Sequence, residues 1–224
     1  MDPQSFSLRN YKAIFFDWDG TLVDTLGFIE GCLNKTLEKF SKEDIRGLGS
    51  VQKSARELFQ STFGDEAEEA LSFYRTCVQE NHLKELKPFA YVENTLTMLQ
   101  KQKIKMGVVS NKAHETLLAE VEHLRWARFF DATIGAGEAM RDKPEADPLN
   151  LAMTRVDRNL DPEYCLYVGD SETDLLCAKN AFMPAILVKL DQKNNDYEKL
   201  EAQHNPIQSL DAVHDLQKLI NASN

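Results

Sequence analysis

The amino-acid sequence predicts an α/β fold: a doubly wound parallel sheet with an inserted all-helical domain. Two observations lead to this prediction. Short apolar runs alternate with segments of helical periodicity, as in sheets that helices cover on both faces. Residues 25–85 interrupt this alternation with helical patterns alone. A parallel crossover needs only about a dozen residues, so this longer stretch favours an insert over a simple connection.

The expected strands are short and mostly apolar. They are Lys12–Phe16, Lys105–Val109, Ala132–Gly135, Tyr164–Val168 and Ala185–Val188, with a further short one near Pro206–Leu210. The helical patterns between and after them are Val92–Lys101, Lys112–Glu122, Asp147–Asp157, Thr173–Asn180 and a closing segment, Asp211–Ile220. This order predicts a Rossmann-like core formed by residues 1–24 and 86–224.

The expected insert, residues 25–85, has apolar residues at helical spacing over Phe28–Phe40, Val51–Phe63 and Glu66–Leu83. Its basic residues either form a solvated helix face or meet a substrate carboxylate or second phosphate. The candidates are Arg46, Lys53 and Arg56.

Composition excludes several classes of protein. A formal net charge of −10 argues against nucleic acid as the main partner, because binding to phosphate backbones depends on Lys and Arg. The four cysteines lack zinc-ligand spacing, which favours packed thiols in a reducing compartment. The first residues do not resemble a secretory signal, and no apolar run approaches the roughly 20 residues that cross a bilayer. We therefore expect a cytoplasmic protein without membrane contact, and the sequence indicates no particular oligomeric state.

Polar residues follow four of the expected strands. They are Asp17 and Asp19 after the first, Ser110 and Asn111 after the second, Lys143 beyond the third, and Asp170 and Asp174 after the fourth. The carboxyl ends of parallel strands share one edge, where open α/β sheets bind ligands. Several carboxylates together need a cation, and oxygen ligands suit a hard ion such as Mg²⁺. Neutral donors with a lysine suit a phosphate group. The sequence thus predicts a metal and phosphate site at this edge.

Each of these residues also has a structural alternative. The two acids of Asp17-Trp18-Asp19-Gly20 suit a turn, and Asp174 suits the first turn of a helix. Ser110, Asn111, Asp170 and Asp24 suit helix N-caps, and Lys143 suits a solvated loop. The histidines lie in polar surroundings, so we expect all five at the surface: His82, His114, His123, His204 and His214.

Taken together, the motifs resemble those of the haloacid dehalogenase superfamily, in the subfamily with a helical cap inserted after the first strand. Phosphoglycolate phosphatase-like enzymes are the most similar. The matching segments, in the family's order, are Asp17–Asp24, Ser110–Lys112, Lys143–Pro148 and Gly169–Asp174. The resemblance covers essentially the whole chain. The chain departs from the family pattern at Ala90-Tyr91, Ala146 and Phe182, which we expect in loops beside the site.

The resemblance implies roles for these residues. Asp17 is expected to be the nucleophile and Asp19 the acid and base, with Lys143 completing the catalytic set. The resemblance implies Mg²⁺ held by Asp17, Asp170 and the backbone carbonyl of Asp19, with Asp174 completing the metal environment directly or by orienting Lys143. The expected phosphate-binding groups are the Trp18 backbone amide, Ser110, Asn111 and Lys143.

The acid at Asp19 favours phosphate monoesters, because expulsion of an alkoxide requires a proton donor. Branches of the family with other chemistry carry tyrosine or alanine here. The related sugar-phosphate mutases typically carry a histidine a few residues beyond the motif, and Thr25–Phe28 contains none. We therefore expect a Mg²⁺-dependent phosphatase of a small phosphorylated metabolite that works through an aspartyl-phosphate. A mutase and a catalytically idle binding or regulatory module remain as alternatives.

Overall fold

The computed structural model describes residues 8–42, 55–190 and 196–221. Its centre is a fully parallel six-stranded sheet in the order β3-β2-β1-β4-β5-β6. The strands are β1 (Ala13–Phe16), β2 (Lys105–Ala113), β3 (Ala132–Ala136), β4 (Cys165–Gly169), β5 (Ala185–Val188) and β6 (Gln208–Leu210). Every strand expected from the sequence is present.

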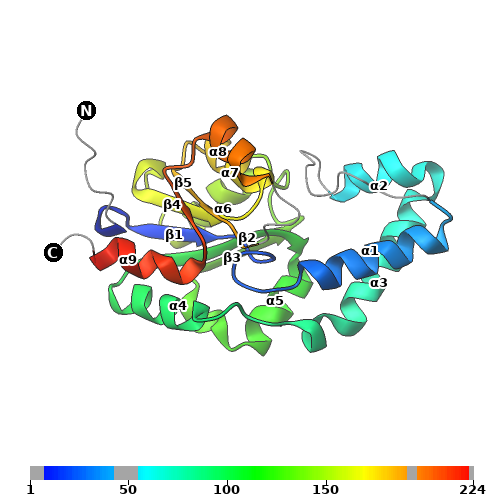
Figure 1. Ribbon diagram of the computed structural model, residues 1–224, viewed down its shortest axis with the longest axis horizontal. Coiled ribbons are helices and arrows are strands. Elements are labelled where there is room, and N and C mark those ends of the chain that lie inside the picture. The colour runs from blue at the N-terminus through cyan, green and yellow to red at the C-terminus, as the bar shows by residue number, and fades with distance from the viewer. Residues whose placement is uncertain (1–7, 43–54, 191–195, 222–224) are drawn as a thin grey trace.

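Helices cover both faces of the sheet (Figure 1). One layer is α4 (Val92–Lys101), α5 (His114–His123) and α9 (Leu216–Asn221), and the other is α6 (Asp147–Val156), α7 (Glu172–Asn180) and α8 (Tyr197–His204). In β1, Ile14 and Phe16 face the first layer whereas Ala13 and Phe15 face the second. This strand is apolar at every position because both of its faces are buried. The doubly wound core is confirmed.

The helical insert between β1 and β2 is also confirmed. It consists of α1 (Leu26–Lys39), α2 (Ala55–Phe63) and α3 (Ala67–Glu85), which we call the cap, and it extends beyond one end of the sheet (Figure 1). Its helices pack around a small apolar cluster of their own: Leu33, Leu37, Phe59, Phe63, Ala67, Ala70 and Leu71. Residues 51–54 of the expected second helix lie outside the described residues.

Two chain segments cross between cap and core, and they lie side by side. The backbone amide of Asp24 donates to the Lys87 carbonyl at 2.7 Å, and that of Phe89 donates to the Leu22 carbonyl at 3.1 Å. Asp24 does not cap α1, since the N-cap residue is Thr25 and no side chain makes a capping bond there.

Some boundaries differ from expectation. Strand β2 continues to Ala113, so α5 begins at His114 rather than near Lys112. The closing segment is a 3₁₀ turn followed by α9, and α8 was not expected. Phe182 follows α7 and precedes β5, so it lies at the opposite edge of the sheet from the carboxyl ends of the strands. The 3₁₀ turns are Leu8–Asn10, Gly64–Glu66, Trp126–Phe129, Pro162–Tyr164 and Val213–Asp215.

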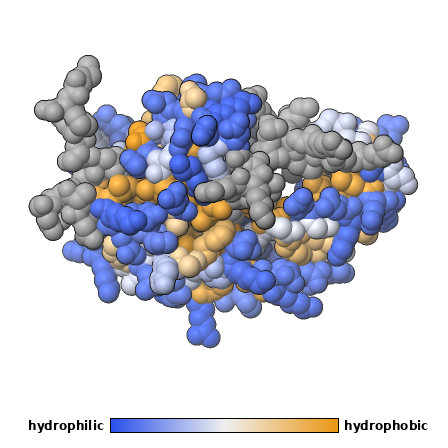
Figure 2. Space-filling view, viewed as in Figure 1, coloured by the Kyte–Doolittle hydropathy of each residue, from blue (hydrophilic) through white to orange (hydrophobic). Residues whose placement is uncertain are grey.

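Hydrophilic residues cover most of the face shown in Figure 2, and hydrophobic residues show mainly as a band across its middle. Within the described ranges, no helix is both long enough and apolar enough to cross a membrane. All four cysteines are free thiols, and three of them are buried: Cys32, Cys165 and Cys177.

Candidate active site

Three buried carboxylates meet at the carboxyl edge of the sheet. Asp17 follows β1, Asp170 follows β4, and Asp174 lies in the first turn of α7. One oxygen of each lies within 4.8 Å of the others, and all three residues are at most 6% exposed. The pairing of β1 with β4 brings them together, as the shared strand edge predicts.

Two glycines permit this close approach. Gly20 has a φ of +78°, and a Cβ there would lie 2.6 Å from Asp170 Oδ2. A Cβ on Gly169 would lie 2.5 Å from the Cβ of Asp174. Any larger residue would push the loops apart, so the glycines belong to the geometry of the site.

Lys143 is buried among these carboxylates and is not a solvated loop lysine. Its Nζ donates to Asp17 Oδ1 and to Asp174 Oδ1, both at 2.7 Å, and to the Tyr167 hydroxyl at 3.1 Å. Burial alone would lower the pKa of Lys143, but the charges of Asp17 and Asp174 outweigh burial and raise it. The side chain therefore carries a positive charge inside the site.

Both oxygens of Asp174 are engaged by the protein. Oδ1 accepts from Lys143 and lies 3.0 Å from the Tyr167 hydroxyl, while Oδ2 accepts from the amide and hydroxyl of Ser171 at 3.1 and 2.6 Å. Ser171 and Asp174 form a capping box, so Ser171 and not Asp170 is the N-cap of α7. Burial raises the pKa of Asp174, but Lys143 and these hydrogen bonds outweigh it and lower the pKa.

Asp17 and Asp170 have the opposite balance. Burial raises the pKa of Asp17 to about 7, against the lowering effect of Lys143. Burial, and then the charges of Asp174 and Asp17, also raise the pKa of Asp170 well above its usual range. The three carboxylates offer only oxygen ligands, and the one positive charge of Lys143 does not balance them. Such a set fits a hard divalent cation. The buried triad can therefore bind a metal ion.

Of the two neutral residues near the end of β2, Asn111 contacts Lys143. The Asn111 side chain exchanges two hydrogen bonds with the backbone of Lys143, at 2.9 and 3.0 Å. Ser110 is 5% exposed, and its Oγ accepts from the Lys112 amide at 3.1 Å. Neither residue caps α5, whose N-cap residue is Ala113. Asn111 thus fixes the loop that carries Lys143.

Asp19 lies apart from the triad, with a side chain 14% exposed. Its Oδ1 accepts from the Thr25 hydroxyl and lies 2.7 Å from Lys112 Nζ. The preceding Trp18 is fully buried, and its Nε1 donates to Glu120 Oε2 at 2.6 Å. The two carboxylates of the first motif therefore occupy different electrostatic surroundings.

Several residues at the site had no role in the sequence analysis. They are Thr21, which donates to Asp170 Oδ1 at 3.2 Å, and Thr25, His82, Lys112, Glu120 and Tyr167. Thr21 and Lys112 belong to segments that match the family's motifs, and that membership is the signal that could have found them. The surface expectation is wrong for His82, which is 6% exposed, while His123 is exposed and the other three are half-buried.

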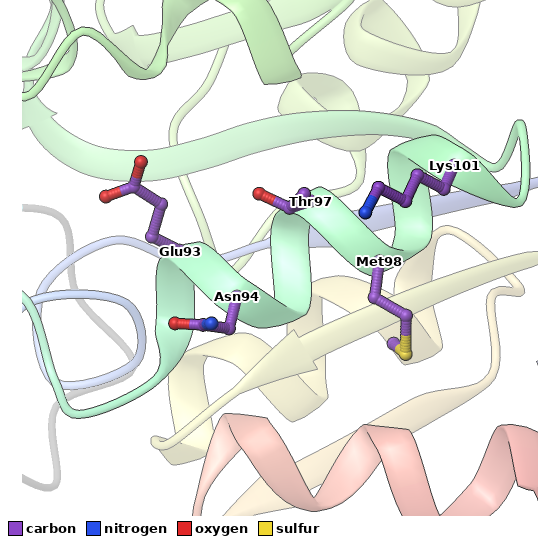
Figure 3. A pocket seen from close by; sticks show the side chains of 5 residues that line it. All are labelled: Glu93, Asn94, Thr97, Met98 and Lys101. Carbon is purple, nitrogen blue, oxygen red and sulfur yellow. The ribbon is translucent and has the colours of Figure 1, made fainter.

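A surface depression lies elsewhere, along α4 (Figure 3). Its lining side chains all come from this one helix: Glu93, Asn94, Thr97, Met98 and Lys101. None of the expected site residues lines it. The depression is therefore separate from the carboxylate site.

A buried carboxylate triad that could bind a metal, at the carboxyl edge of a parallel sheet with a helical insert, is typical of an α/β enzyme. The chain belongs to the haloacid dehalogenase-like hydrolase family, whose model matches residues 14–188. It is an enzyme, a phosphatase or hydrolase of the haloacid dehalogenase type.

Individual relatives cover nearly the whole chain. The pyrophosphatase PpaX of Bacillus mycoides (strain KBAB4) is 29% identical over 218 residues, which cover 95% of this chain and 98% of that protein. A solved structure from Bacteroides fragilis, assigned provisionally to the haloacid dehalogenase-like hydrolases, has 25% identity and a TM-score of 0.80 and covers 92% of this chain and 99% of its own. A predicted phosphoglycolate phosphatase from Haemophilus somnus 129PT shares the fold at 21% identity, with a TM-score of 0.78 and coverage of 94% and 98%.

Proposed function

We propose that this protein is a Mg²⁺-dependent phosphatase that hydrolyses a small phosphate monoester through an aspartyl-phosphate at Asp17. The observation that carries the proposal is the separation of two carboxylates two residues apart. Asp17 lies among Asp170 and Lys143, whereas Asp19 is held by Thr25 and Lys112. Different surroundings suit different roles, a nucleophile and an acid or base.

In the first step, a carboxylate oxygen of Asp17 attacks phosphorus while the bond from phosphorus to the leaving oxygen breaks. Asp19, protonated, gives its proton to that leaving oxygen and becomes a carboxylate. The alcohol then departs with the proton, and the phosphoryl group remains on Asp17.

In the second step, Asp19 accepts a proton from water as the water oxygen attacks phosphorus. The bond between phosphorus and the Asp17 oxygen breaks, which releases inorganic phosphate and restores both carboxyl groups. Closure of the cap over this edge would exclude bulk water during the first step. We assign residues 25–85 to the cap and residues 1–24 and 86–224 to the catalytic core.

Asp17, Asp170 and the backbone carbonyl of Asp19 would hold the Mg²⁺ ion. When bound, it screens the charge of the nucleophile and of the phosphoryl oxygens. Because Lys143, Ser171 and Tyr167 already engage both oxygens of Asp174, we assign Asp174 to orienting Lys143 rather than to direct ligation.

The phosphoryl oxygens would be held by Ser110 Oγ, Lys143 Nζ and the backbone amide of Trp18. Ser110 directly precedes Asn111, whose hydrogen bonds to the backbone of Lys143 tie β2 to the loop after β3. Asn111 therefore contributes by fixing Lys143 in position.

The substrate is a small phosphorylated metabolite in this proposal, and the location is cytoplasmic. Phosphoglycolate is the first candidate, supported by the motif resemblance. Inorganic pyrophosphate is an alternative to a monoester, with phosphate in place of the alcohol as the leaving group, because a relative that is 29% identical over 95% of the chain is named a pyrophosphatase.

The test is a phosphate-release screen with Mg²⁺ over small phosphorylated acids, sugars, nucleotides and pyrophosphate. Asp17→Asn should lower kcat/KM by about 10³-fold or more, because the nucleophile is lost. Asp24→Asn is the matched control, since Asp24 lies in the same motif but is exposed. Ordinary turnover by Asp17→Asn would contradict the assignment of Asp17 as the nucleophile.

Two outcomes of the screen would indicate another function. Isomerisation of a sugar phosphate without phosphate release would indicate a mutase. Tight metal-dependent binding without turnover would indicate an idle module.

A further inference from the structure

A buried polar network contacts Asp19, and its other members are not part of the carboxylate triad. Lys112 Nζ lies 2.7 Å from Asp19 Oδ1, and 2.9 and 2.8 Å from the two carboxylate oxygens of Glu120. The Lys112 side chain is 6% exposed and that of Glu120 is 0% exposed. Lys112 therefore joins two carboxylates in a place that excludes most water.

The Glu120 carboxylate is hydrogen-bonded to side chains from three parts of the chain. Besides Lys112, it accepts from Trp18 Nε1 at 2.6 Å, and its Oε1 lies 3.0 Å from His82 Nδ1. A fully buried carboxylate is costly unless it is paired and hydrogen-bonded, and these contacts satisfy both oxygens. Two of the three lead to the first motif: Trp18 directly precedes Asp19, and Lys112 contacts it.

We propose that Lys112 is a positioning residue that holds Asp19 for proton transfer, and that Glu120 fixes Lys112 in place and links it to the cap through His82. This inference rests on the proposed function, since it assigns a role to residues that contact Asp19, the proposed acid and base. The contacts of Asp19 support it: Thr25 and Lys112 both engage Oδ1, so Oδ2 is the oxygen that remains for the leaving group.

The charge balance argues against a phosphate-binding role for Lys112. Its one positive charge already faces the carboxylates of both Asp19 and Glu120, at 2.7–2.9 Å. Lys143, by contrast, contacts the proposed nucleophile directly. The two lysines of the site therefore have different partners and different tasks.

The network also crosses from core to cap. His82 lies in the last turn of the cap helix α3, and Glu120 lies on the core helix α5 that packs against it. Asp19, Lys112 and Glu120 belong to the core. The hydrogen bond from His82 to Glu120 thus gives the cap a buried contact that leads, through Lys112, to Asp19.

The test compares two aryl esters that differ in how much they need an acid. Phenolate, the more basic leaving group, benefits from protonation, whereas 4-nitrophenolate departs without it. We expect Lys112→Met to lower kcat/KM for phenyl phosphate at least about 10-fold more than for 4-nitrophenyl phosphate, within the usual contribution of general acid catalysis. Glu120→Gln should give the same pattern with a smaller ratio. Lys105→Met, on the same strand but half-exposed, is the matched control and should leave both rates unchanged.

A second readout does not depend on activity. The chain has two tryptophans, so its indole N–H groups give two NMR signals, and that of Trp18 reports on Glu120. Lys112→Met and His82→Asn should each shift the Trp18 signal, and Lys105→Met should not. Equal loss for both esters in Lys112→Met, or an unshifted Trp18 signal, would overturn the inference. If the wild type hydrolyses no ester, the proposed function fails, and the indole signals alone decide whether the network is coupled.

Discussion

Replacement of Lys143 by methionine would remove a positive charge from the centre of the carboxylate triad. Lys143 is 3% exposed and donates hydrogen bonds to Asp17, Asp174 and the Tyr167 hydroxyl. Loss of one partner from a buried ion pair destabilises a protein by about 3–5 kcal/mol, because the remaining charge stays buried. For a chain of this size each kcal/mol corresponds to about 2–4 °C, so we expect Tm to fall by about 6–20 °C without metal.

The assay is thermal unfolding with and without Mg²⁺, together with phosphate release. Added Mg²⁺ should restore part of the loss in Lys143→Met, because it supplies positive charge to the same carboxylates. Activity should fall about 10²-fold or more, because the phosphoryl group loses a positioned charge. Lys105→Met is the control: its pair with Asp131 is half-exposed, so a change of at most about 1 kcal/mol is expected. A Lys143→Met protein as stable and active as the control would refute this reasoning.

Three further predictions concern the metal site and the cap. Burial raises the pKa of Asp17 to about 7, so protons compete with the metal for this carboxylate below that pH. The Kd for Mg²⁺, measured by calorimetry, should therefore rise about 10-fold from pH 8 to pH 6. A constant Kd would contradict this. Gly20→Ala should weaken Mg²⁺ binding, because the added Cβ would meet Asp170. Gly64→Ala is the control: Gly64 also has a positive φ, but a Cβ there would meet no other atom, so this variant should lose only roughly 1–2 kcal/mol of stability. Equal Mg²⁺ affinity in the two variants would contradict the role of Gly20. Phe63→Ala should cost about 3–5 kcal/mol within the cap core and accelerate hydrogen exchange in α1 and α3 but not in β1; uniform acceleration would contradict a separate cap.

The same pH dependence applies to stability. The folded-state pKa of Asp17 is raised from 3.8 to about 7, so this group's contribution to the free energy of unfolding falls as the pH rises through that interval. A bound cation reverses this effect by favouring the ionised form. The increase in Tm on addition of Mg²⁺ should therefore be larger at pH 8 than at pH 6.

The sheet was predictable because strands buried on both faces are apolar throughout. Ala13–Phe16 shows this directly, since its alternate residues face opposite helix layers. Helix α8 was not predicted, and its sequence explains why: of its eight residues only Tyr197 and Leu200 are buried, too few for a recognisable helical pattern. The end of β2 was missed because Ser110, Asn111 and Lys112 interrupt the apolar run with polar residues.

The triad was predictable because each acid follows a strand, and strand ends share one edge. The network behind Asp19 was not, because its contacts join distant elements: Glu120 lies 102 residues from Trp18 and 38 from His82. No local pattern marks a histidine for burial beside a carboxylate, so His82 was expected at the surface. Such pairings depend on how α3 and α5 pack, which follows from the tertiary fold.

Trapping a phosphoryl group on Asp17 tests the proposed mechanism most directly. The protein would be mixed with substrate and Mg²⁺ and quenched with acid, and borohydride would then reduce any acyl phosphate to the alcohol, which converts aspartate to homoserine. Mass spectrometry of the tryptic peptide 13–35 would locate the change. We predict homoserine at position 17 when the wild-type protein is mixed with substrate. The Asp17→Asn variant should contain no homoserine. Phosphate release with an unmodified Asp17, or modification at Asp19 instead, would contradict the assignment of Asp17 as the nucleophile.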